Sequence, residues 1–481
     1  MSDRPWPTSA PAEQGVDASG VLAFLDAVEA APGIEPHSLM IVRHGHLVAS
    51  GWWAPYTPER PHLLYSLSKS FTGTAAALAA AEGLLDLDDP VISHFPEFEA
   101  DITDPRSRAL RVRHVASMAS GHVAETLPAS LAADAAEPVR GFLLVPPERD
   151  PGTVFAYNQP TTYTLAAIVQ KATGQPLTEW LRPRLLDPLG IGDVRWLRDR
   201  TGREIGYSGL HARTDAIARL GELYLRRGQW RGERLLPADW VADASRAHIP
   251  TGDGSKEAAD SDWGQGYGLQ FWRSRHGFRG DGAYGQFCLV LPQQDAVIAT
   301  TADTERMQAL LDLVWAHLLP AFGTAPPTGA GERDAALADR LADLALPPAP
   351  GASVPPARAD AWHGARFTPS GGGCPAQPRL TDARVTSDAD GWSLVLTEAD
   401  EPLRLPFGAP GWTVTEDPLP LAISGGWTSP DTLSLDVAFL ETPHHLLLTC
   451  SLPDAGFTAR WRTTPLHPGR LRSQRATRGR D

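Results

Sequence analysis

The chain has 481 residues, which is enough for two or three domains and for a large hydrophobic core in at least one of them. Its 43 Lys and Arg residues against 57 Asp and Glu residues give a formal net charge of -14. This charge opposes non-specific binding to nucleic acid or to an anionic membrane, so we expect neither partner.

The cysteines, histidines and N-terminal residues exclude further classes. Cys288, Cys374 and Cys450 are widely spaced and form no Cys-x-x-Cys, which predicts free thiols rather than disulfides or a thiolate metal site. The paired histidines lack a third ligand at metal spacing, and we expect no metal and no cofactor. Residues 1–20 contain no apolar run, so the sequence predicts no signal peptide and a cytoplasmic location.

The first elements are predicted in the order helix, strand, strand, helix. Residues 21–30 show an amphipathic helical pattern, and residues 38–42 and 47–53 show the pattern of a hairpin. An alanine-rich run from Ser66 predicts a helix that ends near Gly83, where glycine can adopt the left-handed conformation. A hairpin is therefore expected directly before a long helix with a buried inner face.

Helical patterns predominate from residue 111 to about 240, including one at 162–172 that Gly174 ends. Strands are then predicted at 267–272, 284–291 and 296–301, followed by a helix at 305–318. Strands on both sides of a helical block predict one sheet whose strands come from both ends of this region, an α/β fold of the α+β type with a helical lobe. Ser66 is expected where the sheet meets the lobe.

Composition divides the chain into domains. We predict a first domain at 1–320, a Pro-, Ala- and Gly-rich linker with one short helix at 321–356, a small all-β barrel or sandwich at 357–468 and a basic tail at 469–481. In the β domain, Trp392, Leu394 and Leu396 alternate with polar residues, which is typical of half-buried antiparallel strands.

Ser66-Leu67-Ser68-Lys69 carries the strongest chemical signal in the chain. Residues at i and i+3 lie on one helix face, about 5–6 Å apart at Cβ, so the Ser66 hydroxyl can meet the Lys69 amine. A serine needs a base to become a nucleophile, and burial can lower the pKa of a lysine enough for it to act as one. At a helix start the Ser66 N–H could also stabilise an oxyanion.

Tyr157 is the candidate partner of this pair. It follows the Pro151-Gly152 turn and precedes the predicted helix at 162–172. A phenol beside a lysine can relay the serine proton and later protonate the leaving group. Its alternative interpretation is an ordinary core tyrosine. Asn158, the next residue, is a candidate substrate contact.

A glycine-rich segment at 279–286 leads into an apolar strand. Glycine allows a ligand to approach a strand backbone closely. The residue after Gly282, Ala283, could therefore donate its N–H to the oxyanion, with Asp281 and Tyr284 as flanking substrate contacts. Glycine clusters before strands are also typical of hairpin turns.

Together these segments resemble the serine β-lactamase and penicillin-binding-protein-like hydrolases, specifically the branch with class C β-lactamases, D-alanyl-D-alanine peptidases and β-lactamase-like esterases. The resemblance spans most of residues 10–320. Its supporting segments are residues 82–90, 235–237, Trp240 and 268–272. It implies a β-lactamase/transpeptidase-like antiparallel sheet with a helical lobe, an acylated Ser66, and base and acid roles shared by Lys69 and Tyr157. Which of the two takes the first proton stays open.

Two motifs depart from the family pattern. The tyrosine motif is usually Tyr-x-Asn, whereas here Tyr157 is followed by Asn158 and Gln159, so the amide is displaced by one residue or lengthened by a methylene. The third motif normally begins with Lys or His, but this chain offers Gly280-Asp281-Gly282 or Asp281-Gly282-Ala283. An aspartate there would repel a substrate carboxylate, which favours neutral or cationic substrates, although Arg279 and His276 could compensate.

The sequence therefore favours a serine hydrolase that cleaves a small ester or amide through an acyl-Ser66 intermediate, with weak or no β-lactamase activity. The alternatives are a true β-lactamase or D-Ala-D-Ala-type peptidase, and a degenerate homologue that only binds a ligand. The absence of His-Glu-x-x-His and Gly-x-Ser-x-Gly disfavours a metallohydrolase and an α/β-hydrolase. The expected partner is a small molecule, and a homo-oligomer stays open.

Overall fold

The computed structural model describes residues 5–323, 329–355, 359–371, 375, 377–389, 391–467 and 469–477. Cys374 therefore lies outside the described residues, as does the end of the predicted basic tail. Compactness divides the chain into two units. The first comprises Met1–Gly51, Leu64–Ala302 and Arg306–Ala342, and the second comprises Trp52–Leu63, Asp303–Glu305 and Asp343–Asp481.

The sheet of the first unit has six strands in the order β2-β1-β11-β10-β9-β8. Its strands are β1 (Glu35–Arg43), β2 (His46–Trp52), β8 (Trp272–Arg273), β9 (Phe278–Gly282), β10 (Gln286–Leu291) and β11 (Ala296–Asp303). The N-terminal hairpin thus joins strands from more than two hundred residues later, as the sequence predicts. Almost every residue of β1 is buried, because helices cover both of its faces.

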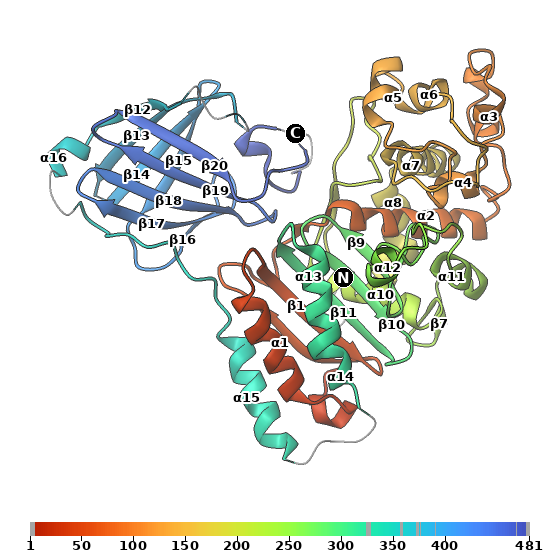
Figure 1. Ribbon diagram of the computed structural model, residues 1–481, viewed down its shortest axis with the longest axis horizontal. Helices are drawn as coiled ribbons and strands as arrows, with labels where there is room; N and C mark the ends of the chain where they lie inside the picture. Colours follow the sequence, from red (N-terminus) through yellow and green to blue (C-terminus); the bar gives the residue numbers. More distant parts are fainter. Residues whose placement is uncertain are drawn as a thin grey trace. The chain divides into compact units, whose positions relative to one another are not determined.

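Helices α1 (Ala18–Ala30) and α10 (Thr214–Leu225) both pack on β1. Figure 1 shows α1 beside α13 (Met307–Leu313) and α15 (Ala330–Ala342). Helix α15 packs on α1, so it belongs to the first compact unit, whereas composition places it in the linker at 321–356. The domain bounds predicted from the sequence stay a prediction. A π-helical turn, Val314–Leu318, continues α13, and α14 (Leu319–Ala321) ends the segment.

The helical lobe is built around α2 (Ser68–Ala81) and α7 (Gln159–Thr173), which pack on each other. Gly174 adopts the left-handed conformation, with φ of 67°, and ends α7 as its position in the sequence predicts. The other helices are α3 (Pro105–Arg108), α4 (Val112–Ala116), α5 (Leu127–Ala133), α6 (Pro138–Leu144), α8 (Leu177–Leu181), α9 (Asp187–Leu189), α11 (Ala238–Ser245) and α12 (Lys256–Asp260). Short strands pair β4 (Arg195–Trp196) with β5 (Leu210–Ala212), and β6 (Gln229–Trp230) with β7 (Glu233–Arg234).

One strand prediction in this unit was wrong, and another was confirmed with a later start. Residues 267–272 form no regular strand beyond the start of β8, because Gln270 has φ of 62° and buries its amide against Thr162. The strand predicted from residue 284 begins at Gln286 instead. A further strand, β9, precedes it, and the turn between them places Tyr284 at φ of 68°. The glycine-rich motif is therefore the end of one strand and a hairpin turn.

The second unit is an all-β structure, as predicted. One nine-stranded sheet runs in the order β15-β14-β13-β12-β20-β19-β18-β17-β16 and is antiparallel except between β12 and β20. β15 also lies against β16 and β17, so the sheet nearly closes around one apolar core. The elements are α16 (Ala359–Trp362), β12 (Arg366–Pro369), β13 (Leu380–Asp388), β14 (Gly391–Glu398), β15 (Glu401–Phe407), β16 (Thr413–Thr415), β17 (Leu421–Ser429), β18 (Thr432–Phe439), β19 (His445–Ser451) and β20 (Gly456–Trp461).

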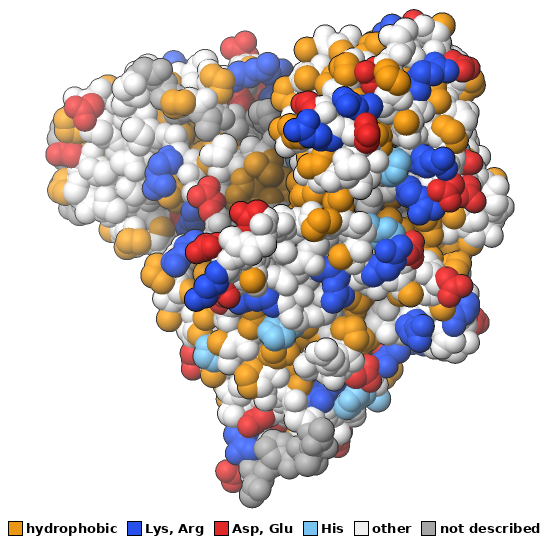
Figure 2. Space-filling view, turned by 45° about the vertical axis from the view of Figure 1, so that its right-hand side comes forward, with side chains coloured by type: hydrophobic (Ala, Val, Ile, Leu, Met, Phe, Trp, Pro, Cys, Tyr) orange, Lys and Arg blue, Asp and Glu red, His pale blue; other side chains and the backbone are white. Residues whose placement is uncertain are grey.

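Surface charge is mixed rather than segregated on the face shown in Figure 2, where acidic and basic side chains are interspersed. Exposed ion pairs occur in the described residues, such as Arg113 with Asp88 at 2.7 Å. Within the described residues, no helix combines the length and apolar character needed to cross a bilayer.

Candidate active site

Ser66 lies on a short 3-10 turn, Tyr65–Leu67, that leads directly into α2. Lys69, one turn later on α2, donates a hydrogen bond from Nζ to Ser66 Oγ at 3.0 Å. Ser66 is half-buried, whereas only 1% of Lys69 is exposed. The turn therefore presents an accessible hydroxyl to an amine that is withdrawn from water, as the i, i+3 spacing predicts.

The Lys69 amine is surrounded by neutral oxygen atoms. Besides Ser66, it donates to Gln159 Oε1 at 2.6 Å and to the backbone oxygen of Tyr207 at 2.8 Å. Among the described residues, no carboxylate lies within ion-pair distance of it. Burial lowers the pKa of Lys69 to about 7, although the more distant charges of Glu125 and Asp281 act in the opposite direction. A substantial fraction of the amine is therefore neutral near pH 7.

Tyr157 lies on the other side of this amine. Lys69 Nζ is 4.7 Å from the centroid of the Tyr157 ring, and the ring stacks on Trp272 at 5.4 Å. Burial raises the pKa of the Tyr157 phenol, while a hydrogen bond with Ser66 acts in the opposite direction. Tyr157 is therefore a neutral phenol in contact with the serine. Its hydroxyl can relay a proton, but it does not act as the base.

The amide beside Lys69 belongs to Gln159 and not to Asn158. Asn158 is fully buried, and its Oδ1 accepts hydrogen bonds from the backbone N–H and the hydroxyl of Thr126, both at 3.0 Å. Successive side chains at a helix start point about 100° apart, so only one of the two can face the lysine. Of the two sequence alternatives, the structure has the amide lengthened by a methylene, because Gln159 and not Asn158 contacts Lys69. The substrate contact of Asn158 stays a prediction.

The glycines of β9 allow that strand to pack against the nucleophile turn. A Cβ at Gly282 would lie 2.2 Å from the backbone oxygen of Leu64, and one at Gly280 would lie 2.9 Å from Ser70 Oγ. Ala283 follows directly, at the start of the hairpin turn, and Tyr284 packs its ring edge on Tyr65 at 5.4 Å. The glycines thus bring the third motif to the serine through close backbone contact.

Asp281 is paired with Arg279, whose Nε donates to Asp281 Oδ2 at 2.8 Å. Both side chains are buried, and the Arg279 guanidinium lies 4.6 Å from the Trp263 ring centroid. Burial raises the pKa of the Asp281 carboxyl, whereas Arg279 acts in the opposite direction. Strand alternation predicts this pairing, while His276 packs on Trp315 instead. The position where the family pattern has a cation thus holds an internal ion pair.

Two further residues of the site were missed by the sequence analysis. Glu125 accepts the backbone N–H of Gln159 at 3.1 and 3.2 Å, which satisfies a free donor at the start of α7. Tyr207 supplies the carbonyl that holds Lys69. Neither has a local signal, because an acid in a loop and a backbone oxygen far along the chain become partners only through folding.

The family model described as Beta-lactamase matches residues 24–309, which is more than half of the chain. The chain belongs to the beta-lactamase family. This confirms the resemblance and the fold class, and this beta-lactamase-family protein is a serine hydrolase.

Relatives with curated names include hydrolases of the family. The chain is 27% identical over 283 residues to the 6-aminohexanoate-dimer hydrolase of Paenarthrobacter ureafaciens. The aligned region covers 54% of this chain and 71% of that protein. It is 30% identical over 155 residues to the lovastatin esterase of Penicillium rubens. This aligned region covers 28% of this chain and 39% of that protein.

Solved structures show the same fold in this beta-lactamase-family chain. A putative beta-lactamase from Bacteroides dorei matches with a TM-score of 0.53 and 14% identity, over 63% of this chain and 99% of that chain. SurE matches with a TM-score of 0.50 and 20% identity, over 86% of this chain and 95% of that chain. At these identities the likeness establishes the fold alone.

Proposed function

We propose that the chain hydrolyses a small ester or amide through an acyl-enzyme formed on Ser66. The observation that carries the proposal is the 3.0 Å contact between Ser66 Oγ and a buried Lys69 amine with a pKa of about 7. A base is most useful when its pKa lies near the working pH, because it is then both available and able to hold a proton.

In the first half of the reaction, the neutral Lys69 amine takes the proton of the Ser66 hydroxyl while Oγ attacks the substrate carbonyl carbon. The resulting oxyanion is held by the backbone N–H groups of Ser66 and Ala283. The carbonyl re-forms, the bond to the leaving group breaks, and the proton passes from Lys69 through the Tyr157 hydroxyl to the leaving oxygen or nitrogen. Water then attacks the acyl-Ser66 ester by the reverse route and releases the acid.

The assignment of Lys69 rather than Tyr157 as first base rests on their opposite pKa shifts. Burial disfavours the charged form of each group, so it lowers the pKa of the lysine and raises that of the phenol. At neutral pH the amine can accept a proton, and the phenol already holds one. Gln159 and the Tyr207 carbonyl orient the amine without adding charge.

The proposed substrate has no carboxylate next to the scissile bond. In the third motif, Arg279 is already paired with Asp281 at 2.8 Å, so it offers no unpaired cation to such a group. This supports an ester or amide hydrolase with weak or no β-lactamase activity, because a β-lactam carries a carboxylate close to its reactive carbonyl.

Steady-state kinetics on p-nitrophenyl acetate and on the β-lactam nitrocefin test the proposal, with Ser66→Ala as the matched variant. We expect ester turnover that Ser66→Ala abolishes and little nitrocefin turnover. Efficient nitrocefin hydrolysis beside poor ester cleavage would identify a true β-lactamase. Folded protein without Ser66-dependent turnover of either compound would identify a ligand-binding homologue.

A further inference from the structure

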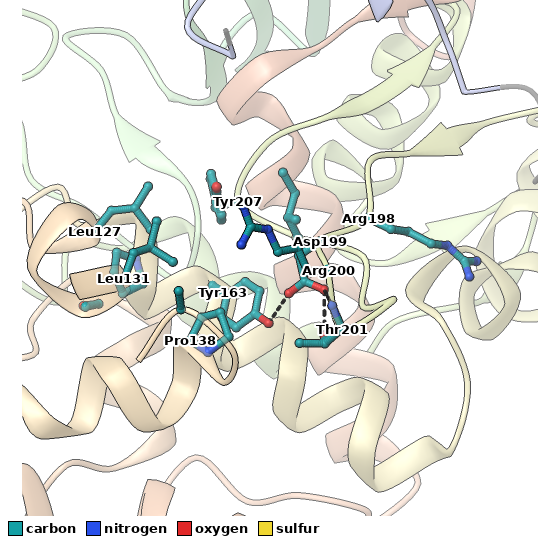
Figure 3. A pocket seen from close by; sticks show the side chains of 13 residues that line it. Leu127, Leu131, Pro138, Tyr163, Arg198, Asp199, Arg200, Thr201 and Tyr207 are labelled. Carbon is teal, nitrogen blue, oxygen red and sulfur yellow. Dashed lines mark hydrogen bonds between the residues drawn. The ribbon is translucent and has the colours of Figure 1, made fainter. Parts of the chain in front are cut away.

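A cavity of about 650 Å³ lies in the helical lobe, between α5, the start of α7 and the loop at residues 198–201. Figure 3 shows Leu127 and Leu131 of α5 on one side of it and Asp199 to Thr201 on the other. Pockets of this size accommodate a drug-sized group. None of the catalytic roles described above uses this space.

The cavity adjoins the catalytic lysine through two of its lining residues. Tyr207 lines the cavity with its side chain and accepts the Lys69 amine with its backbone oxygen at 2.8 Å. Pro160 also lines it and directly follows Gln159, whose amide oxygen accepts the same amine at 2.6 Å. A substrate whose carbonyl carbon is at Ser66 would therefore have this cavity within reach on the Lys69 side.

The lining is mainly apolar and extends to the surface. Leu127, Pro138 and Ile205 contribute to the wall, and Leu131 is 40% exposed at its edge. A hollow lined mainly by apolar side chains is a place where an apolar ligand is desolvated.

The opposite wall carries the polar side chains Arg198, Asp199, Arg200 and Thr201, and contacts of Asp199 fix the loop. Tyr163 donates a hydrogen bond to Asp199, and the Asp199 carboxylate also accepts from Thr201. Arg198 forms an ion pair with Glu204 at 3.4 Å, and Arg203 forms one with Glu137, the residue before α6. These contacts hold the loop in place, so the cavity is a preformed space rather than a gap that a small motion would fill.

We propose that this cavity binds the acyl group of the substrate, and that this group is an extended apolar chain. The proposal rests on the proposed acyl-Ser66 function and names its substrate class. The acyl group stays on Ser66 after the leaving group departs, so a partly enclosed cavity suits the acyl group, whereas a leaving group needs an open route. Leu131 at the edge is the specificity-determining residue.

The test compares kcat/KM for p-nitrophenyl acetate, butyrate, octanoate and dodecanoate, which share one leaving group. We expect the octanoate-to-acetate ratio to be at least about 10, because each buried methylene adds binding. Leu131→Trp should fill the edge of the cavity and lower this ratio by about tenfold, and Leu131→Ala should move the optimum toward dodecanoate. Leu84→Trp is the matched control, because Leu84 is 38% exposed and lies outside the cavity lining.

A wild-type ratio near one, or a ratio that neither Leu131 variant changes, would overturn the acyl-pocket proposal. A series of acetate esters of longer alcohols separates the two ends of the substrate. If activity rises with the alcohol rather than with the acyl chain, the cavity holds the leaving group and the proposal is wrong. In each case Ser66-dependent turnover of p-nitrophenyl acetate would leave the proposed function standing, whereas its absence would remove both.

Discussion

Lys69 in the first unit and the Asp436 cluster in the second unit are both buried, but their partners differ in kind. Lys69 is held by a hydroxyl, an amide oxygen and a backbone carbonyl, all neutral. Asp436 instead accepts from His445 Nδ1 at 2.8 Å and pairs with Arg462 at 2.7 Å.

This difference separates a reactive group from a structural one. A buried charge without an opposite charge is destabilised, and its pKa moves toward the neutral form, as it does for Lys69. A buried charge with opposite partners is stabilised by them, and the protein loses stability when one partner is removed. Lys69 is thus arranged to exchange a proton, whereas the Asp436 cluster is arranged to hold β18 and β19 together.

The comparison predicts the largest effect for Lys69→Met. Loss of the base should lower kcat by about 10²–10⁴-fold. The free energy of unfolding should stay the same or rise, because a thioether replaces an amine that is costly to bury. Kinetics on p-nitrophenyl acetate and chemical denaturation measure the two quantities. Lys171→Met, at an exposed lysine paired with Glu97, is the control and should leave kcat unchanged.

Asp436→Asn should have the opposite profile. Removal of the carboxylate leaves His445 and Arg462 without their shared acceptor, and we expect a loss of about 2–3 kcal/mol in the free energy of unfolding, reduced from the value for a fully buried pair because Arg462 is partly exposed. Asp388→Asn removes the same charge from an exposed pair with Arg404 and should cost less than about 0.5 kcal/mol. Equal losses in the two variants would contradict the structural role of the cluster.

Tyr157→Phe should lower kcat by about 10–100-fold, because the hydroxyl that passes the proton to the leaving group is lost while the ring that packs on Trp272 remains. The acid limb of the pH profile, where activity rises as Lys69 loses its proton, should stay at the same pH. A shift of the limb in Tyr157→Phe would instead assign the titrating base to the tyrosine.

The smallest effect is expected for Glu125→Gln. The wild-type kcat/KM should rise with pH through about 7, because only the neutral Lys69 amine can accept the serine proton. Glu125 stabilises the protonated amine, so its removal lowers the lysine pKa and should move the acid limb to lower pH by about 0.3 unit, a small step because Glu125 is exposed and its field is screened. A shift to higher pH would contradict this sign.

The part of the site that could be predicted is the part that local geometry determines. Ser66 and Lys69 meet because they are one helical turn apart, and Arg279 meets Asp281 because alternate residues of a strand share a face. The all-β character of the second unit was predicted from the alternation of apolar and polar residues, as at Trp392, Leu394 and Leu396. β9 was missed because two glycines and two charged residues hide the strand pattern, and only packing against the nucleophile turn explains them.

The choice between Asn158 and Gln159 could not be made from the sequence. It depends on Thr126, which donates a hydrogen bond to the Asn158 side-chain oxygen, and on Glu125, which accepts the first backbone N–H of α7. Both act across more than thirty residues, and the Tyr207 carbonyl acts across a still longer separation. Partners of this kind follow from the tertiary structure alone.

The most direct test of the account is covalent labelling of Ser66 by a fluorophosphonate, followed by intact-protein and peptide mass spectrometry over a range of pH. The account predicts one adduct, located on Ser66, absent in Ser66→Ala, and formed at a rate that rises with pH around a midpoint near 7. No adduct on folded wild-type protein, or an equal adduct on Ser66→Ala, would contradict the claim that Ser66 is a nucleophile activated by a buried, neutral Lys69.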